Sequence, residues 1–206
     1  MPHNKDLKRL VRARMAETGE NYTQALTALL ADTQLDPLPH GWHMSGSHRA
    51  DYEAGLLPRT CAYEGKRLIR LRFRAAEPAG FGTVMQSIDA TRYRGLRVRF
   101  SAVIRGQEIG NWAGIWLRVD STKREKVLDN MQDRPLRGTT DWTEAANVLD
   151  VGEDAASVHF GVLLGGAGAV DLAQPRFDVV GIDVPVTPIT RKPLAPEPQG
   201  LDLGAA

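Results

Sequence analysis

Hydrophobic residues recur along this chain with two different periods. In residues 5–17 they stand three or four positions apart among basic residues, which predicts an amphipathic helix that ends at Gly19. A second helix is expected over residues 22–31, capped by Asn21 or Thr23. Because helices of about ten residues are not stable alone, this hairpin must pack on the rest of the chain, on a partner or on a second copy.

Beyond residue 40 apolar and polar residues alternate, as half-buried strands require. In residues 67–74, Leu71 and Phe73 face one way, and Arg70, Arg72 and Arg74 face the other. Glycine-rich turns separate about ten such segments, with no helical pattern between them. The strands are expected at residues 42–45, 52–56, 67–74, 82–88, 95–104, 113–120, 127–131, 144–150, 157–164 and 170–180. This pattern predicts an antiparallel β-sandwich.

The same patterns divide the chain into four parts. We expect a basic helical hairpin in residues 1–36, a proline-rich linker in residues 37–40 and the sandwich in residues 41–182. Residues 183–206 hold five of the twelve prolines and almost no large apolar side chain, so they are expected to form a disordered tail.

Composition points to a cytoplasmic protein. No apolar run approaches 18 residues, and the first residues lack the hydrophobic region of a signal peptide, so no membrane partner is expected. The lone Cys61 agrees with a reducing compartment. The net charge is +1, but residues 66–105 alone carry +8 and the remainder about −7, so the strands of the first half are strongly basic.

Three of the four tryptophans lie in residues 110–142, beside amide and charged side chains. Strand alternation there turns Ile115, Leu117 and Val119 toward the core and Trp116, Arg118 and Asp120 the other way, and it also turns His159 outward. One sheet face could therefore offer a stacking platform with hydrogen-bond donors for a sugar, a nucleobase or a polycyclic ligand. Gln86 is ambiguous because it shares a face with Val84. The candidate residues are Trp112, Trp116, Arg118, Asp120, Gln86, Asn130, Gln132 and His159; the alternative is that the tryptophans cover the core edge and the polar groups are solvated.

Residues 139–180 resemble the last strands of jelly-roll domains of the galactose-binding or carbohydrate-binding-module type. Trp142 opens a strand, the acidic turn GEDAA follows, and a glycine-rich turn leads to the closing strand. Residues 41–181, with GTTDW and DNMQDRP, also resemble an uncharacterised bacterial domain sometimes joined to helix-turn-helix regulators. The resemblance implies a mainly β fold, an antiparallel jelly-roll sandwich preceded by a short helical hairpin.

The resemblance also bears on individual residues. It places Trp142 against the sheet as a structural residue, and Tyr52 and Glu53 at the border of the ligand face. The carboxylate that often ligates a structural calcium in such domains would fall at Ala173, which cannot ligate, so neither calcium nor any other cofactor is expected. The segment TGENYTQAL resembles ribbon-helix-helix antitoxin modules, although the basic strand of those modules is missing.

Catalytic motifs are absent from the sequence: it holds no GxSxG, no HExxH and no phosphate loop, so catalytic residues are unknown and an enzymatic role is left open. His43, His48 and Asp51 lie in a glycine- and serine-rich loop, and no metal site is expected there.

Three function hypotheses remain. The first is non-catalytic binding of a small-molecule or carbohydrate-like ligand on a tryptophan-lined concave sheet face, in a sensor or self-resistance protein. The second is a small-molecule pathway enzyme that uses the same face. The third is a DNA-associated or antitoxin-like regulator acting through the N-terminal hairpin as a homodimer. The arginine-rich strands would either hold phosphates of an acidic partner or form a solvated face met by carboxylates.

Overall fold

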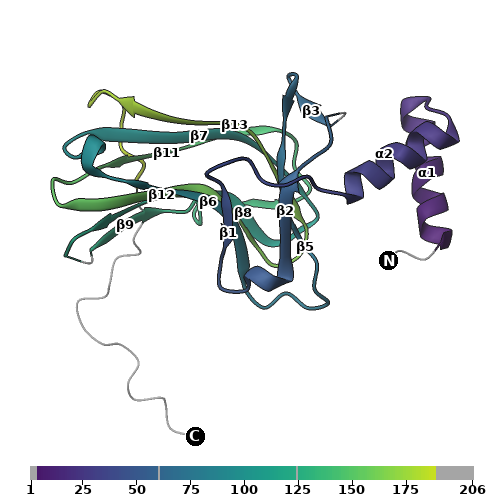
Figure 1. The fold of residues 1–206 in the computed structure, drawn as a ribbon, viewed down its shortest axis with the longest axis horizontal. Helices are drawn as coiled ribbons and strands as arrows, with labels where there is room; N and C mark the ends of the chain where they lie inside the picture. The colour runs from purple at the N-terminus through teal and green to yellow at the C-terminus, as the bar shows by residue number, and fades with distance from the viewer. Residues whose placement is uncertain (1–3, 60, 124, 189–206) are drawn as a thin grey trace, which may run out of the picture.

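Two antiparallel β-sheets form the body of the protein (Figure 1). The computed structural model describes residues 4–188 except 60 and 124, so most of the predicted tail lies outside the described residues. The six-stranded sheet has the order β1-β6-β12-β8-β10, and β9 also pairs with β8. Its strands are β1 (His43–Ser45), β6 (Phe81–Asp89), β8 (Ile109–Ser121), β9 (Lys126–Asp129), β10 (Leu136–Gly138) and β12 (Ala155–Gly165).

The five-stranded sheet has the order β11-β7-β13-β5-β2. Its strands are β2 (Tyr52–Leu56), β5 (Ile69–Phe73), β7 (Arg97–Gln107), β11 (Thr143–Asp150) and β13 (Ala169–Val180). A short hairpin, β3 (Ala62–Tyr63) and β4 (Lys66–Arg67), and two 3-10 turns, η1 (Arg49–Asp51) and η2 (Thr91–Tyr93), complete this region. The predicted mainly β, antiparallel sandwich is confirmed, although β3, β4 and β10 were not expected from the sequence.

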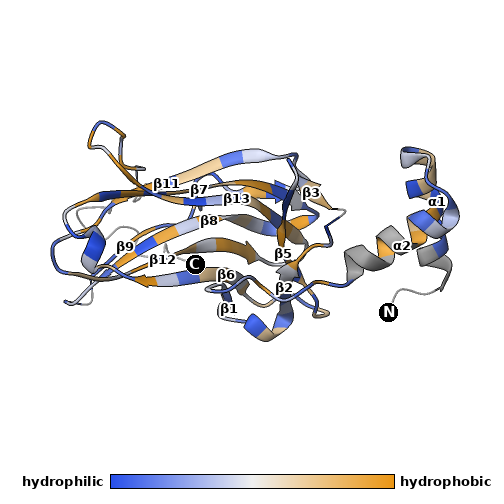
Figure 2. Cartoon of the chain, turned by 45° about the horizontal axis from the view of Figure 1, so that its top comes forward, coloured by the Kyte–Doolittle hydropathy of each residue, from blue (hydrophilic) through white to orange (hydrophobic). Residues whose placement is uncertain are grey.

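The core lies between the two sheets and is built by strand alternation, visible as alternating colours along the strands in Figure 2. Ile115 and Leu117 of β8 are fully buried, as the alternation predicts. Phe160 lies at the centre, with its ring 4.9 Å from that of Phe100 and 4.7 Å from that of Phe177. Aromatic and β-branched residues from both sheets therefore hold the sandwich together.

Two helices precede the sandwich: α1 (Asn4–Thr18) and α2 (Tyr22–Thr33). Gly19, at φ +73°, ends α1 and donates its N–H to Met15 O. Asn21 Oδ1 accepts from Gln24 N while Gln24 Oε1 accepts from Asn21 N, which is a reciprocal cap at the start of α2. The local signals in the sequence thus place both the end of the first helix and the start of the second.

The segment after α2 is attached to the edge of the five-stranded sheet. Asp36 and Leu56 exchange two backbone hydrogen bonds of 2.9 Å, and Asp36 also forms an ion pair with Arg67. Gly55 allows this approach, because a Cβ there would overlap the backbone of Asp36 and lie 2.7 Å from Leu35 Cβ. The segment after α2 therefore forms an isolated antiparallel bridge with β2.

The other end of the sandwich is covered by the residues that follow β13. Arg97 donates to Ile182 O and Val184 O, at 2.9 and 2.7 Å. Thr187 donates its N–H to Val148 O, and Thr187 Oγ1 accepts from Val148 N at 2.8 Å. The first residues of the predicted tail thus lie along the outer edge of β11.

Candidate functional site

The outer face of the six-stranded sheet carries a cleft of about 530 Å³. The strand registers arrange its side chains in rows across β6, β12 and β8. The rows are Phe81–Gly165–Trp112, Thr83–Leu163–Gly114, Met85–Gly161–Trp116 and Ser87–His159–Arg118. β1 adds Ser45 and His43 beside the second and third rows, β9 adds Leu128, and the loop after β9 adds Asn130. Five strands therefore contribute to one site.

Two glycines of β12 stand opposite the tryptophans of this face, Gly165 opposite Trp112 and Gly161 opposite Trp116. A Cβ on Gly165 would lie 3.2 Å from Trp112 Nε1, and a Cβ on Gly161 would overlap Val84 O and lie 2.8 Å from Met85 Cα. Trp116 Nε1 donates to Thr83 Oγ1 on β6, at 2.8 Å. Trp116 is only 6% exposed, so it forms the floor of the cleft.

The wall of this apolar half comes from neighbouring rows. Met85 and Leu163 are each 8% exposed and pack with Trp116, while Trp112 packs against this cluster and is half-buried. Phe81 stands at the end of the cleft with 36% of its surface exposed. Trp112 is therefore the indole that a ligand would meet, above a floor made by Trp116.

A polar cluster occupies the fourth row. The two ring nitrogens of His159 lie 2.8 Å from Ser157 Oγ and Ser87 Oγ. Arg118 donates to Asp120 Oδ2 at 3.0 Å, and Asp120 Oδ2 lies 3.5 Å from His159 Nε2. Burial lowers the pKa of His159 below its ordinary value, and the Arg118 guanidinium lowers it further, against the opposing effect of Asp120. His159 is therefore neutral at pH 7, and the Arg118–Asp120 pair is balanced in charge.

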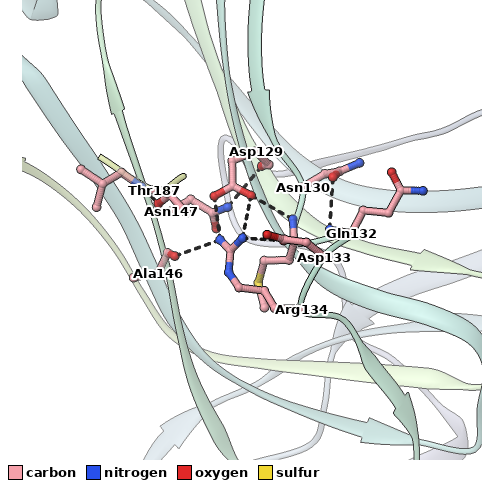
Figure 3. A network of polar contacts seen from close by, with 10 residues as sticks. Asp129, Asn130, Gln132, Asp133, Arg134, Ala146, Asn147 and Thr187 are labelled. Carbon is pink, nitrogen blue, oxygen red and sulfur yellow. Dashed lines mark hydrogen bonds and ion pairs between the residues drawn. The ribbon is translucent and has the colours of Figure 1, made fainter. Parts of the chain in front are cut away.

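Asn130 reaches the cleft from a loop that a buried polar network holds in place (Figure 3). Asp129 accepts two bonds from the Arg134 guanidinium, at 3.1 and 2.6 Å, and a third from Met131 N at 3.0 Å. Asn147 of β11 is fully buried and donates to Asp129 O, which joins this loop to the other sheet. The loop that carries Asn130 is thus held by Arg134 on one side and by Asn147 of the other sheet on the other.

The structure brings five of the predicted site residues together in the cleft: Trp112, Trp116, Arg118, Asn130 and His159. Asp120 lies behind this row, engaged by Arg118. Gln132 is exposed on the loop and does not line the cleft. Gln86 lies on the opposite, inner face of β6 beside Trp42 and Phe160, so its placement on the ligand face is wrong. Strand alternation places Gln86 on the same face as Val84, and in the structure both face the core.

The placement of Tyr52 and Glu53 beside the ligand face is also wrong. Strand β2 belongs to the five-stranded sheet, where the Tyr52 hydroxyl donates inside the sandwich to Gly80 O and Gly166 O. Glu53 forms an ion pair with Arg72 at 2.9 Å. Periodicity identifies this strand correctly, but it does not say which sheet the strand joins.

Several cleft residues were not singled out from the sequence for this face: Ser45, Phe81, Thr83, Met85, Ser87, Leu128 and Leu163. Strand alternation in TVMQS could have indicated Met85, because its neighbours Val84 and Gln86 face the core and Met85 therefore faces outward. His43 was considered only as a metal ligand. Among the described residues no three His, Cys, Asp or Glu side chains gather in a way that could hold a metal ion.

The basic strands lie on the five-stranded sheet. β13 separates β5 from β7, so the arginines of these two strands do not form one continuous ladder. Each pairs with a carboxylate from another strand: Arg70 with Asp171, Arg72 with Glu53, Arg97 with Asp150 and Arg99 with Asp178. The carboxylates meet the arginines as the second alternative described, but the Arg70–Asp171 pair is buried rather than solvated.

Asp171 lies in β13 of the five-stranded sheet, and Trp142 directly precedes β11 of the same sheet. The ring of Trp142 lies 4.6 Å from Tyr63 and 4.6 Å below the Arg105 guanidinium. Asp171 is fully buried and accepts from both Arg70 and Arg105. Asp171 is the carboxylate nearest in sequence to Ala173, the position of the family's calcium ligand. Its oxygens already accept hydrogen bonds from two guanidiniums.

Known proteins resemble this chain in sequence and in fold. No family model matches the chain. The uncharacterized HTH-type transcriptional regulator YbfP of Bacillus subtilis strain 168 is 36% identical over 168 residues, which is 81% of this chain. The chain spans 57% of the length of that regulator.

Two solved structures share the architecture. The C-terminal family 22 carbohydrate-binding module of a Clostridium thermocellum xylanase is 16% identical with a TM-score of 0.52, over 69% of this chain and 88% of that chain. A xylan-binding domain of the same family 22 is 15% identical with a TM-score of 0.52, over 72% and 95%. This chain has the jelly-roll fold of the carbohydrate-binding modules. The predicted resemblance is therefore confirmed for the fold, and the name of the Bacillus relative agrees with a domain joined to regulators.

No helix among the described residues has both the length and the apolar character that a membrane crossing requires.

Proposed function

We propose that this chain binds a neutral, carbohydrate-like ligand in the cleft, without catalysing a reaction, as the sensing part of a cytoplasmic transcriptional regulator. The observation that carries the proposal is the cleft itself, in which an accessible indole and a row of hydrogen-bonding side chains border one small space. Its volume lies within the range of about 300–1,000 Å³ typical of small-ligand sites.

The charges of the cleft favour an uncharged ligand. Arg118 is matched by Asp120, and burial keeps His159 neutral by lowering its pKa. A ligand with several hydroxyl groups satisfies such a row through neutral hydrogen bonds, while its ring can stack on Trp112.

A binding role is favoured over catalysis by the groups that line the cleft. Glycoside hydrolysis generally uses a pair of carboxyl groups on either side of the scissile bond. None of the described residues that line the cleft is a carboxylate, and the nearby Asp120 and Asp129 are each held by an arginine.

The regulatory part of the proposal rests on the named relative. The Bacillus protein is called a transcriptional regulator, and this chain matches a little over half of its length. We therefore assign the sandwich of residues 41–182 to ligand sensing and the hairpin of residues 1–36 to association with a second copy or with DNA. The exposed side chains of Lys8, Arg9 and Arg12 on α1 support a nucleic-acid contact.

The ligand-binding proposal is tested by calorimetric titration of the full chain with mono- and disaccharides. Trp112→Ala is expected to weaken binding at least tenfold while the melting temperature stays near that of the native chain. Trp142→Phe is the matched control, because Trp142 packs beside the five-stranded sheet and does not line the cleft, and it should bind normally. Heat signals that are equal in all three proteins, or absent from all three, would refute the proposal.

The hairpin assignment has a separate test. Retention of the full chain on a double-stranded DNA column should fall steeply with salt and drop when Lys8, Arg9 and Arg12 are changed together to Gln. Light scattering on the same samples reports whether two copies associate. Unchanged retention of the triple variant would remove the hairpin from DNA contact.

A further inference from the structure

The cleft is not uniform along its length. The large apolar side chains of its central strands, Trp112, Leu163 and Met85, occupy the first three rows, and Ser87, His159 and Arg118 occupy the fourth. The neighbouring strands are mixed: Ser45 and His43 of β1 border the second and third rows, and Leu128 of β9 borders the fourth. Building on the binding function proposed above, we propose that the ligand is an amphiphilic glycoside. Its sugar ring lies at the polar row, and an aryl or alkyl substituent extends over the apolar rows.

The centre of the apolar half, formed by Thr83 and Trp116, has little hydrogen-bonding capacity left for a ligand, while Ser45 and His43 stand at its β1 side. Thr83 Oγ1 donates to Val162 O at 2.8 Å and accepts the indole N–H of Trp116. Sugar hydroxyls placed over this floor would lose water without gaining partners, whereas an apolar group loses nothing there.

The apolar half is also accessible to a ligand. Trp112 is half-buried and Phe81 is 36% exposed at the end of the cleft, so apolar surface remains in contact with solvent. Covering such surface with an apolar substituent is favourable in proportion to the area removed from water. The ligand chemistry that fits this end is therefore hydrocarbon.

The polar half has unused donors that point to a sugar. Arg118 donates from Nη2 to Asp120 Oδ2, and its Nε lies 2.8 Å from Asp120 Oδ1 without forming a hydrogen bond. Asn130 Oδ1 accepts from Gln132 N. Neither Arg118 Nη1 nor Asn130 Nδ2 makes a hydrogen bond to any residue that the structure describes, and both side chains line the cleft. Ser87 adds an exposed hydroxyl to the same row.

The separation of the two ends requires both parts in one ligand. Trp112 and Arg118 are six residues apart on β8, which is about 20 Å at roughly 3.3 Å per residue. A single sugar ring does not reach from one end to the other. A long apolar molecule would span the cleft but leave the donors of the fourth row unsatisfied.

The test uses matched probes on the full chain. Glucose, galactose, xylose and N-acetylglucosamine are titrated in parallel with their phenyl and n-hexyl β-glycosides, and with phenol and n-hexanol, by isothermal calorimetry at two temperatures. At least one glycoside is expected to bind ten or more times tighter than its parent sugar, with a more negative heat-capacity change. It should also bind at least tenfold tighter than its free alcohol.

Variants assign the two ends. Phe81→Ser, at an exposed position that tolerates substitution, and Leu163→Ala should lower the preference for glycoside over parent sugar at least threefold. Arg118→Gln should weaken glycosides and sugars by the same factor, and Trp142→Phe should change neither.

The remaining outcomes separate this inference from the function on which it rests. Sugars or oligosaccharides that bind as tightly as the glycosides would overturn the amphiphilic ligand and leave carbohydrate binding intact. Free alcohols that bind as tightly as the glycosides would overturn the sugar component. If no sugar, glycoside or alcohol binds, both the inference and the proposed function fall.

Discussion

Replacing Asp171 by asparagine tests the buried charge network of the five-stranded sheet. Asp171 accepts from Arg70 Nε and Nη2, at 2.7 and 2.9 Å, and from Arg105 Nη2 at 2.7 Å. The Asp171 side chain is 1% exposed and that of Arg70 is 7% exposed. The substitution Asp171→Asn would keep the shape of the side chain but leave two guanidiniums beside a neutral group.

The expected cost follows from burial. Removing one partner of a buried ion pair typically costs about 3–5 kcal/mol, because the remaining charge cannot reach water. Arg105 is 31% exposed and can regain some hydration, so a loss of about 3 kcal/mol is expected. Asp150→Asn is the matched control: Asp150 binds Arg97 through two bonds, but it is 63% exposed. Its removal should cost about 0–1 kcal/mol.

Urea denaturation followed by far-ultraviolet circular dichroism gives both free energies of unfolding. Near-ultraviolet dichroism or tryptophan fluorescence adds a local readout, because Trp142 stacks against Arg105. The reasoning is refuted if the two variants lose equal stability, or if Asp171→Asn loses less than about 1 kcal/mol, the ceiling for exposed pairs.

Three further predictions concern the cleft. Burial lowers the pKa of His159, so the folded chain resists protonation of this ring. The resulting stability is present above about pH 6.5, the pKa of a free histidine, and is lost as the pH falls through the lower pKa of the folded state. Melting temperatures measured at pH 5–8 should therefore vary less in His159→Gln than in the native chain. Gly161→Ala should cost about 1–3 kcal/mol in urea titrations, since its Cβ meets sheet backbone, whereas Gly152→Ala, which meets only a flexible carboxylate, should stay within about 0.5 kcal/mol. Asp129→Asn should lose about 1–3 kcal/mol and also weaken ligand binding, because Arg134 no longer anchors the Asn130 loop; unchanged affinity would contradict this link.

The features of the fold that depend on residues close together in the chain could be predicted from the sequence. Alternation assigned the inward and outward residues of β8 because each strand residue faces opposite to the next. Gly19 and Asn21 marked the helix ends through backbone conformation and capping, which are also local. These interactions span a few residues, so the sequence displays them directly.

The site depends on which strands pair with one another, and the hydrophobic periodicity of the sequence does not show this. Tyr52 was assigned to the wrong sheet because the order of strands is set by long-range packing. His43 and Ser45 join the cleft through β1, a strand of three residues that is too short to show a period. Trp116 was a candidate contact, but Met85 and Leu163 of neighbouring strands pack with it and leave it 6% exposed, and no pattern within β8 indicates this.

The contacts of Thr187 with β11 have a consequence for solubility. β11 is the last strand of its sheet, and its outward backbone groups could pair with the same edge of another molecule. Thr187 satisfies both backbone groups of Val148, and Arg97 holds the preceding segment over that edge. The chain that follows β13 thus acts as a guard against edge-to-edge aggregation, and a chain cut after Ile182 should self-associate even though every strand of the sandwich remains.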